Sequence, residues 1–393
     1  MNSEPSSEKQ RRMSKSRIYL DNNATTRMLP VVADAMSNAW MQAFANPGSQ
    51  HSFGRDARKL LESSRDMIAN VLNCESDEVI FTSGGTESIN SAIHGLTTGR
   101  RGTIAVTAGE HPATTAACSR AIENGMKQIT MPVDDNGLLQ LESLNGLPWD
   151  ELCLVAVILA HNETGIIQRL ERLSDLCEEH RVPLLVDAVQ AVGKIPVDFR
   201  ALRATALAFG AHKFHGPRGI GGLLLRRGVR LVSLLNGGHQ ESGRRAGTEP
   251  VPLISGMAES LRLFQLNAQD GMDAIGRMRD ELQQRIERDC APVVVHGKEV
   301  DRLPNTLSVA FPGLEGEAML VNFNMEGIAC SLGSTCASGS AEPAPALLAM
   351  GIPDDVCMAS VRFSLSCQTT EDEVRVAADR IAGVVNRMRS AAG

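Results

Sequence analysis

The chain has 393 residues, of which 43% are hydrophobic and 22% are charged, and its formal net charge is −7 at pH 7. This composition is ordinary for a globular protein with a large core, and the negative charge argues against a nucleic-acid-binding surface. No apolar run is long enough to span a bilayer, and residues 1–17 are polar and lack the apolar segment of a secretory signal. We therefore expect a cytoplasmic protein without nucleic-acid or membrane partners, whose residues 1–17 form a disordered tail.

The first two thirds of the chain alternate between strand and helix patterns. A short strand at 17–20 precedes two helices, at 30–43 and 55–72. Strands are then expected at 79–82, 103–107, 128–133, 153–160, 183–186, 206–209 and 219–225, and helices between them at 87–96, 112–123 and 169–180. This alternation predicts an α/β fold with a mainly parallel, mixed sheet.

The pattern changes after Pro252. Two helices, at 254–266 and 272–290, lead to shorter strands at 293–296, 306–311, 328–331 and 361–365, and these alternate with helices at 317–325, near 347 and at 371–388. We expect a large domain at 18–262 and a smaller C-terminal α/β domain at 263–393.

One lysine stands at the end of an apolar strand. Lys213 follows the run at 206–209 and a pair of small residues, and it lies between two histidines. Because lysines are rarely placed beside a core without a partner or a task, we interpret Lys213 as a Schiff-base lysine for pyridoxal phosphate. The alternative is a lysine whose amine reaches solvent from a loop.

Polar residues follow several other predicted strands. Asp187 ends the strand at 183–186, where a carboxylate facing the ligand crevice could keep a pyridinium nitrogen protonated. Gly85 and Thr86 open a helix and could bind a phosphate through backbone N–H groups and a hydroxyl. His111 begins another helix and could lie against a flat ring. Each residue could instead be a helix cap, but together they indicate one rim of an active site.

Three further features lie outside these strand ends. Asn162 belongs to a polar stretch after the strand at 153–160, and the loop at 236–248 is rich in hydrogen-bond donors. The nine cysteines show neither CxxC pairs nor the spacing of metal ligands, so we expect no metal site. Cys336 differs from the others because it lies among small and hydroxyl residues, as an accessible thiol would. Arg362 sits within a strand and could bind a carboxylate.

Ten motifs in order resemble those of the cysteine desulfurases of the NifS/IscS type, which are members of the class V aminotransferase family with the fold-type I pyridoxal phosphate architecture. They are YLDNNATT, ANPGSQHSFG, FTSGGTES, EHPA, HNETG, LLVDAVQAVGK, AHKFHGPRGIG, RAGTEPV, GSTCASG and VRFSLS, and the resemblance runs from about Ile18 to the last helix.

The resemblance implies a pyridoxal 5'-phosphate site. Lys213 would hold the cofactor, Asp187 would pair with the ring nitrogen, Gln190 would bind the ring hydroxyl and His111 would stack on the ring. The phosphate would be held by Gly85, Thr86, His212 and, from a second subunit, Thr248, which implies a homodimer with shared sites.

It also implies a reaction. Asn162 and Arg362 would bind the carboxylate of L-cysteine, and Lys213 would remove the Cα proton. Cys336 would take the sulfur as a persulfide while L-alanine leaves, and a sulfur-acceptor protein would carry it towards iron–sulfur clusters or another sulfur-containing cofactor. A selenocysteine lyase or another class V aminotransferase-type enzyme is the alternative. One departure concerns Gly210, where the family usually has a hydroxyl residue, so a phosphate donor is missing.

Overall fold

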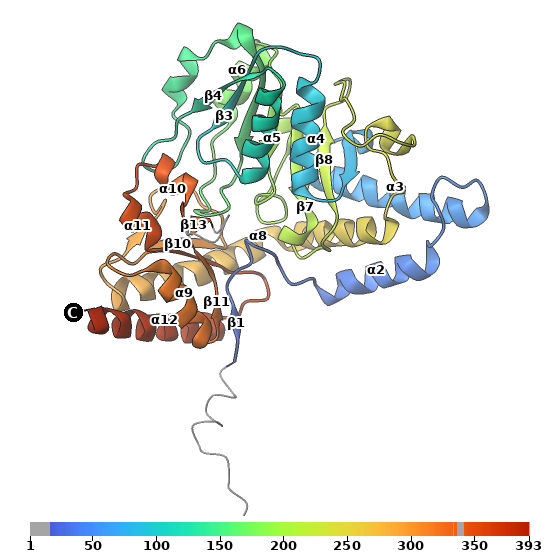
Figure 1. Cartoon of the computed structure of the whole chain (residues 1–393). Helices are drawn as coiled ribbons and strands as arrows, with labels where there is room; N and C mark the ends of the chain where they lie inside the picture. Colours follow the sequence, from blue (N-terminus) through green and yellow to red (C-terminus); the bar gives the residue numbers. More distant parts are fainter. Residues whose placement is uncertain (1–15, 333, 336–341, 393) are drawn as a thin grey trace, which may run out of the picture.

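A computed structural model of the chain describes residues 16–332, 334–335 and 342–392 (Figure 1). The predicted tail at residues 1–17 lies almost entirely outside these ranges and stays a prediction. No helix in the described ranges combines the length and the apolar character needed to cross a bilayer.

A seven-stranded sheet forms the centre of the larger part of the molecule. Its order is β2-β8-β7-β6-β5-β3-β4, and only β8 runs antiparallel to its neighbours. The strands are β2 (Val79–Thr82), β3 (Thr103–Thr107), β4 (Lys127–Met131), β5 (Leu152–Ile158), β6 (Leu184–Asp187), β7 (Ala206–Gly210) and β8 (Gly221–Leu225). This arrangement confirms the predicted α/β fold with a mainly parallel, mixed sheet.

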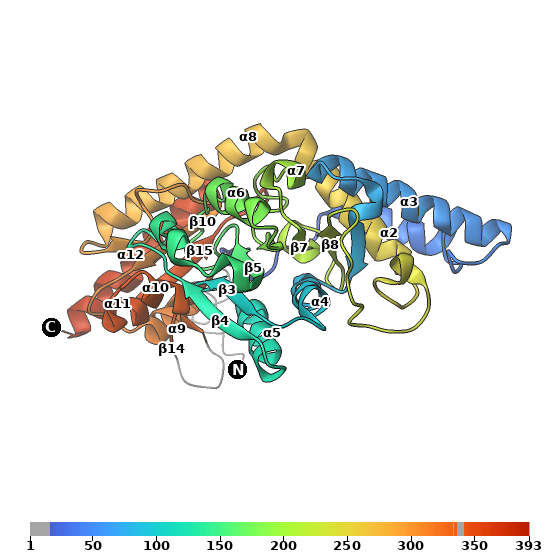
Figure 2. The same cartoon turned by 90° about the horizontal axis from the view of Figure 1, so that it is seen from above.

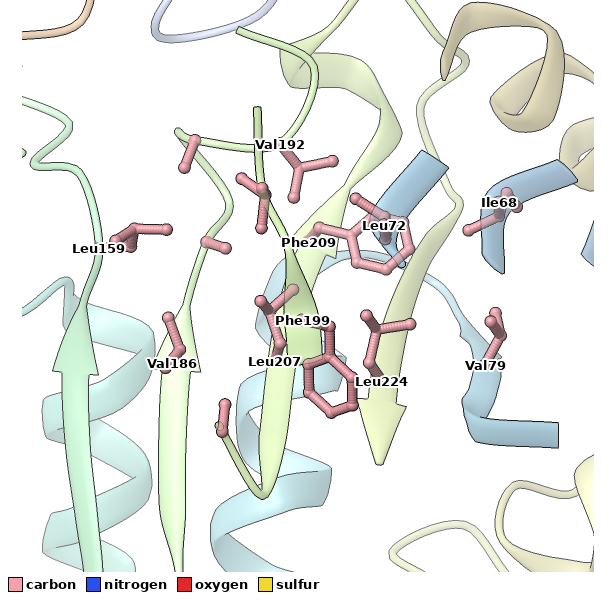
Figure 3. Close-up of a cluster of buried hydrophobic side chains, with 14 of the residues drawn as sticks. Ile68, Leu72, Val79, Leu159, Val186, Val192, Phe199, Leu207, Phe209 and Leu224 are labelled. Atoms are coloured by element: carbon pink, nitrogen blue, oxygen red, sulfur yellow. The ribbon is translucent and has the colours of Figure 1, made fainter. Parts of the chain in front are cut away.

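Both faces of the sheet are buried at its inner strands β5, β6, β7 and β8. Because successive side chains of each strand point to opposite faces, each face has its own hydrophobic cluster. In β7, Leu207 and Phe209 belong to one hydrophobic cluster, whereas Ala206 and Ala208 belong to another. Figure 3 shows part of the first cluster, where Leu207 and Phe209 lie beside Leu224 of the next strand.

Helices cover the two faces. The side of Ala206 and Ala208 is covered by α4 (Gly85–Thr97) and α5 (Pro112–Glu123). The other side is covered by α3 (Ser52–Leu72), α6 (Glu171–Glu179), α7 (Phe199–Leu202) and the first turns of α8 (Val251–Asp289). Outside this layer, α2 (Pro30–Gln42) packs along α3 and α8. Short 3₁₀ turns complete this part: η1 (Ser76–Glu78), η2 (Leu141–Gly146), η3 (Trp149–Glu151), η4 (Ala211–Lys213) and η5 (Gln240–Gly243).

The long helix α8 joins the two parts of the molecule. The two helices predicted at 254–266 and 272–290 are one continuous helix of 39 residues, so the predicted break is wrong. The break was suggested by the polar residues between Asn267 and Gly271, which interrupt the apolar pattern; they are partly or wholly exposed here. Seen from above, α8 extends along both parts, while α2 and α3 project at one end (Figure 2).

The C-terminal part has its own sheet and core. Its four-stranded antiparallel sheet has the order β12-β15-β10-β9, formed by β9 (Val294–Val295), β10 (Thr306–Ala310), β12 (Ser331–Leu332) and β15 (Ser360–Ser364). The helices are α9 (Gly316–Met325), α10 (Pro345–Ala349), α11 (Asp354–Met358) and α12 (Glu371–Ala392). Two strand pairs complete it: β1 (Ile18–Tyr19) with β11 (Ile328–Ala329), and β13 (Ser334–Thr335) with β14 (Glu342–Pro343).

We propose that the two parts are the domains expected from the sequence. Ile18 and Leu20 pack in the same hydrophobic cluster as the second part of α8, β10, β15 and α12. The residues that open the predicted large domain therefore contribute to the core of the smaller one, and a boundary near residue 262 falls inside α8.

A buried ion pair fastens the loop after β8 to the sheet edge. Arg65 of α3 donates from Nη1 and Nη2 to the Glu241 carboxylate over 2.8 and 2.9 Å, and the Phe81 backbone N–H donates to the same carboxylate over 3.1 Å. The two charged side chains are only 9% and 1% exposed. Glu241 adopts a left-handed backbone (φ 49°), so strain is accepted to place this carboxylate.

Replacing Glu241 by Ala is expected to destabilise the protein strongly. The change removes the buried carboxylate that pairs with Arg65 and leaves the guanidinium with only the partly exposed Glu62, which costs up to about 3–5 kcal/mol in comparable sites. Urea unfolding should show this loss, and an Arg65→Met/Glu241→Leu double variant should lose much less because no lone charge remains. The exposed Arg227–Asp77 pair is the control, since Arg227→Ala should have a far smaller effect. Equal effects of Glu241→Ala and Arg227→Ala would contradict the assignment.

Candidate functional site

A cavity of about 380 Å³ opens at the carboxyl ends of the parallel strands. It brings together most of the residues expected from the sequence: Gly85, Thr86, His111, Asn162, Asp187, Gln190, His212, Lys213 and Arg362. Asn23, Ala24, Ile89, Ala113, Ile158 and Val189 complete its wall.

Neighbouring strands place the lysine and the aspartate. Asp187 is the last residue of β6, and Lys213 ends the turn η4 that follows β7. Because β6 and β7 pair in parallel, their carboxyl ends meet at the same edge of the sheet.

Asp187 is an acid held in an apolar environment. It is 4% exposed, and its Oδ1 accepts one hydrogen bond, from the Val189 backbone N–H over 2.9 Å. Burial raises the pKa of Asp187 to about 6, although the nearby charge of Lys213 acts in the opposite direction. A buried carboxylate without a cation bound to it is poised to pair with a positively charged ligand atom.

The amine of Lys213 has a lowered pKa. Its Nζ donates to the backbone oxygens of Asn23 and Ala24 over 2.7 and 3.0 Å. Burial lowers the pKa of Lys213 to about 8, and the charge of Arg362 lowers it further. A sizeable share of this amine is therefore neutral near pH 8, which is the form that attacks a carbonyl carbon.

Two histidines face the cavity as neutral rings. Burial lowers the pKa of both His111 and His212 to about 4, and the Lys213 charge adds to the effect. His111 caps α5 by accepting from the Ala113 backbone N–H at Nδ1 over 3.1 Å. Its proton is thus on Nε2, which makes the ring a neutral donor.

The N-terminus of α4 forms one end of the cavity. Helix N-termini leave backbone N–H groups without helical partners, so this end suits an anion such as a phosphate. Gly85 is required for close packing, because a Cβ there would lie 2.5 Å from Cγ2 of Val189. Gly210 lies next to it, and a Cβ at Gly210 would come within 3.2 Å of the Gly85 nitrogen. A hydroxyl residue at position 210 would therefore crowd this end of the site.

A second group of polar atoms comes from the C-terminal part. Arg362 of β15 donates from Nη2 to Asp21 over 2.8 Å and from Nη1 to the Asn162 backbone oxygen over 2.9 Å. Within the described ranges, the buried Nε of Arg362 and Oδ1 of Asn162 have no hydrogen-bond partner. Buried polar atoms normally have partners, so these two atoms indicate a polar ligand that is bound during function.

One predicted residue of the described ranges lies away from this cavity, and another falls outside those ranges. Thr248 is exposed, in the segment before α8, and does not line it. Cys336 lies outside the described residues, so its role stays a prediction.

Reasoning from the sequence missed three residues that shape the site. Asn23 lines the cavity, Asp21 pairs with Arg362, and Glu110 lies fully buried near Asp187. Burial, together with the negative charge of Asp187, raises the pKa of Glu110 to about 8. The motifs YLDNNATT and EHPA contained these residues, but sequence alone gave no chemical reason to single them out.

Comparisons with known proteins find similarity along nearly the whole chain. The model of the class V aminotransferase family matches residues 18–376. The cysteine desulfurase NifS of Azotobacter vinelandii is 40% identical over 95% of this chain and 94% of its own length, and a cysteine desulfurase of Trichormus azollae is 39% identical over the same shares. A solved structure of a NifS-like protein matches with a TM-score of 0.88 at 32% identity, covering 94% of this chain and 100% of that chain.

Replacing Asp187 by Asn should stabilise the cofactor-free protein in a pH-dependent way. The acid has a pKa of about 6 when folded and about 3.9 when unfolded, so its burial penalty is absent below pH 4 and complete above pH 6. We expect Asp187→Asn to gain on the order of 2 kcal/mol over the wild type at pH 7 and little at pH 4.

Thermal melts at the two pH values measure this difference. Asp34→Asn, on the exposed side of α2, should show no such trend. A gain for Asp187→Asn that is the same at pH 4 and pH 7 would contradict the explanation.

Proposed function

The chain belongs to the class V aminotransferase family, whose members depend on pyridoxal 5'-phosphate, and on that premise we propose that it is a cysteine desulfurase. The observation that carries the proposal is the meeting, in one cavity, of a lysine of lowered pKa, a buried aspartate and a neutral histidine. Curated relatives of about 40% identity bear the name cysteine desulfurase.

The residues present fit pyridoxal 5'-phosphate. Asp187 offers a buried acid with a single hydrogen bond, which suits the protonated ring nitrogen. The start of α4 suits the phosphate, and the missing Cβ of Gly85 leaves the room that Val189 needs. We assign Lys213 as the residue that holds the cofactor covalently and His111 as the ring against its face. When bound, the cofactor supplies an electron sink for the charge that develops at the substrate Cα.

Substrate binding falls to the polar atoms between the two parts of the molecule. Arg362 has its guanidinium oriented by Asp21 and Asn162, and each terminal nitrogen keeps a second N–H. A guanidinium oriented in this way is suited to the carboxylate of L-cysteine. Lys213, once the substrate amine has taken its place, is free to accept the Cα proton at Nζ, and its lowered pKa matches this task.

The sulfur step needs a thiol, and we assign it to Cys336. The Cys336 sulfur attacks the substrate sulfur, so that an S–S bond forms as the C–S bond breaks. L-Cysteine and the Cys336 thiol thereby give L-alanine and a Cys336 persulfide, and all atoms and electrons are accounted for without another reactant. An acceptor protein then takes the sulfur, for iron–sulfur clusters or another sulfur-containing cofactor.

The first test is spectroscopic and chemical. The purified protein should show a visible band from the cofactor, and L-cysteine should change this band and yield alanine, with sulfide in the presence of a reductant. Lys213→Ala should lose the band, and Cys336→Ala should keep it but lose activity on L-cysteine. Full activity of Cys336→Ala on L-cysteine would contradict the desulfurase and favour a selenocysteine lyase. A keto acid product would favour an aminotransferase.

We also propose a homodimer in which Thr248 completes the partner's phosphate site. Thr248 is exposed and away from the cavity of its own chain, as this role requires. The end of α2, the loop after it and the start of α3 carry an apolar patch that suits an interface between subunits. It consists of Trp40, Met41, Phe44 and Phe53, which are 56–77% exposed.

Mixed dimers test the shared site. Thr248→Ala should weaken binding of pyridoxal 5'-phosphate about tenfold, because one hydrogen bond to a charged group is lost. A dimer of one Lys213→Ala chain and one Thr248→Ala chain should regain one site of wild-type affinity, since Lys213 and Thr248 of that site come from different chains. A mixed dimer without a restored site, or a protein that sediments as a monomer, would contradict the proposal.

A cytoplasmic location is the remaining proposal. The eight cysteines within the described ranges are all free thiols, as is usual in a reducing compartment.

A further inference from the structure

Lys194 is a partly buried lysine to which the reaction gives no role. It lies four residues after Gln190, in the turn beyond β6, and closes the motif LLVDAVQAVGK. Its Nζ donates to Asn23 Oδ1 over 2.7 Å and also to Gln190 Oε1. Both acceptors are neutral amide oxygens, and Lys194 forms no ion pair with any of the described residues. Burial lowers the pKa of Lys194 well below its usual value, with further lowering by the charges of Lys213 and Arg362.

These contacts determine which end of the Gln190 amide can face the cavity. An amide side chain can usually turn over, because its oxygen and nitrogen ends have the same shape. The Lys194 amine donates, so the end of the amide that faces it is the oxygen, and the Asn23 backbone oxygen, which can only accept, is 2.9 Å from Gln190 Nε2. With the oxygen bound by Lys194 and one N–H bound by Asn23, the amide keeps one N–H for a ligand. Since Gln190 lines the cavity, it can serve there as a donor.

The second acceptor of Lys194 is itself held in place. Asn23 Oδ1 also accepts from Asn305 Nδ2 over 3.0 Å, and Asn23 Nδ2 donates to Thr306 Oγ1 over 2.9 Å. Lys194 is therefore attached to a fixed point, and Gln190 is the less constrained of its two acceptors.

We propose that Lys194 is a positioning residue that fixes Gln190 as a hydrogen-bond donor to the ring hydroxyl oxygen of the cofactor. This inference rests on the proposed function, because it requires pyridoxal 5'-phosphate in the cavity. A donor at this oxygen would favour its ionised form, so Lys194, which does not line the cavity itself, would act on the ring through Gln190.

The apolar surroundings of Lys194 allow a substitution that removes its hydrogen bonds and keeps its packing. Lys194 also lines a second cavity of about 470 Å³, which is bordered mainly by apolar residues between α2 and α8. A methionine at this position keeps the length of the side chain and suits an apolar wall, but it removes both hydrogen bonds. Lys298→Met is the matched control, because Lys298 is an exposed lysine paired with Glu287 in the C-terminal part.

A double-mutant cycle between Lys194 and Gln190 tests the proposal. Pyridoxal 5'-phosphate is titrated into cofactor-free wild type, Lys194→Met, Gln190→Ala and the double variant, and the dissociation constant and visible spectrum are recorded. Lys194→Met should weaken cofactor binding about tenfold, because Gln190 would then lose its charge-assisted hydrogen bond to the ring oxygen. The variant should also absorb more strongly at short wavelength, where the form of the cofactor with a protonated ring oxygen absorbs. In the Gln190→Ala background the same change should alter affinity less than about twofold, because residues that act as a unit are not additive.

The other outcomes are decisive as well. Equal weakening by Lys194→Met with and without Gln190 would show that the lysine acts through Asn23 or through folding, and would overturn the inference. Unchanged affinity and spectrum would also overturn it. If Lys194→Met does not fold, as judged by circular dichroism, Lys194→Gln replaces it; its amide can orient either way, so a smaller change of the same sign is expected, and no change would overturn the inference.

The test separates this inference from the proposed function. A wild-type protein that binds pyridoxal 5'-phosphate but does not convert L-cysteine would remove the proposed activity and leave the role of Lys194 in place. A wild-type protein that does not bind the cofactor would overturn both.

Discussion

The hydrogen bonds of one buried asparagine hold the parts of the site in register. Asn23 is 1% exposed, and all its polar atoms are engaged. Its partners come from segments that follow strands of the large sheet and from or beside strands of the C-terminal sheet: Asn162, Gln190, Lys194, Lys213, Asn305, Thr306 and Ser364. Satisfied polar networks of this kind specify a single arrangement, because any displacement leaves buried groups unpaired. The distance between the lysine and the arginine of the site therefore depends on a residue with no chemical role.

Burial in this site changes the pKa values of four groups that line the cavity. Burial raises the pKa of Asp187 and lowers the pKa values of Lys213, His111 and His212. The protein thus keeps an amine ready to react and rings that stay neutral, at a cost in stability of the cofactor-free state. Binding of a cationic ring beside Asp187 and of an anion at the start of α4 would restore part of the lost stability.

The fold and most of the site were predictable because both depend on local patterns. Apolar runs ended in polar residues, and parallel strands bring such ends to one edge, so Asp187 and Lys213 were placed correctly without any contact being known. The continuity of α8 was not predictable, since its polar and largely exposed middle resembles a break although it stays helical. Asn23 and Lys194 were missed for a related reason. Their importance comes from partners more than a hundred residues away, such as Asn305, and no spacing rule reports such partners.

The long helix α8 has a mechanical consequence. Its first turns belong to the core of the large sheet, and its last turns belong to the core of the C-terminal sheet. A continuous helix is a stiff rod, whereas a hinge needs a few residues that can change their backbone angles freely. The Asp21–Arg362 pair and the hydrogen bonds of Asn23 add polar contacts between the two parts. Together with the stiff helix, these contacts oppose rotation of one part against the other, so the lysine and the arginine of the site keep their separation when a ligand enters.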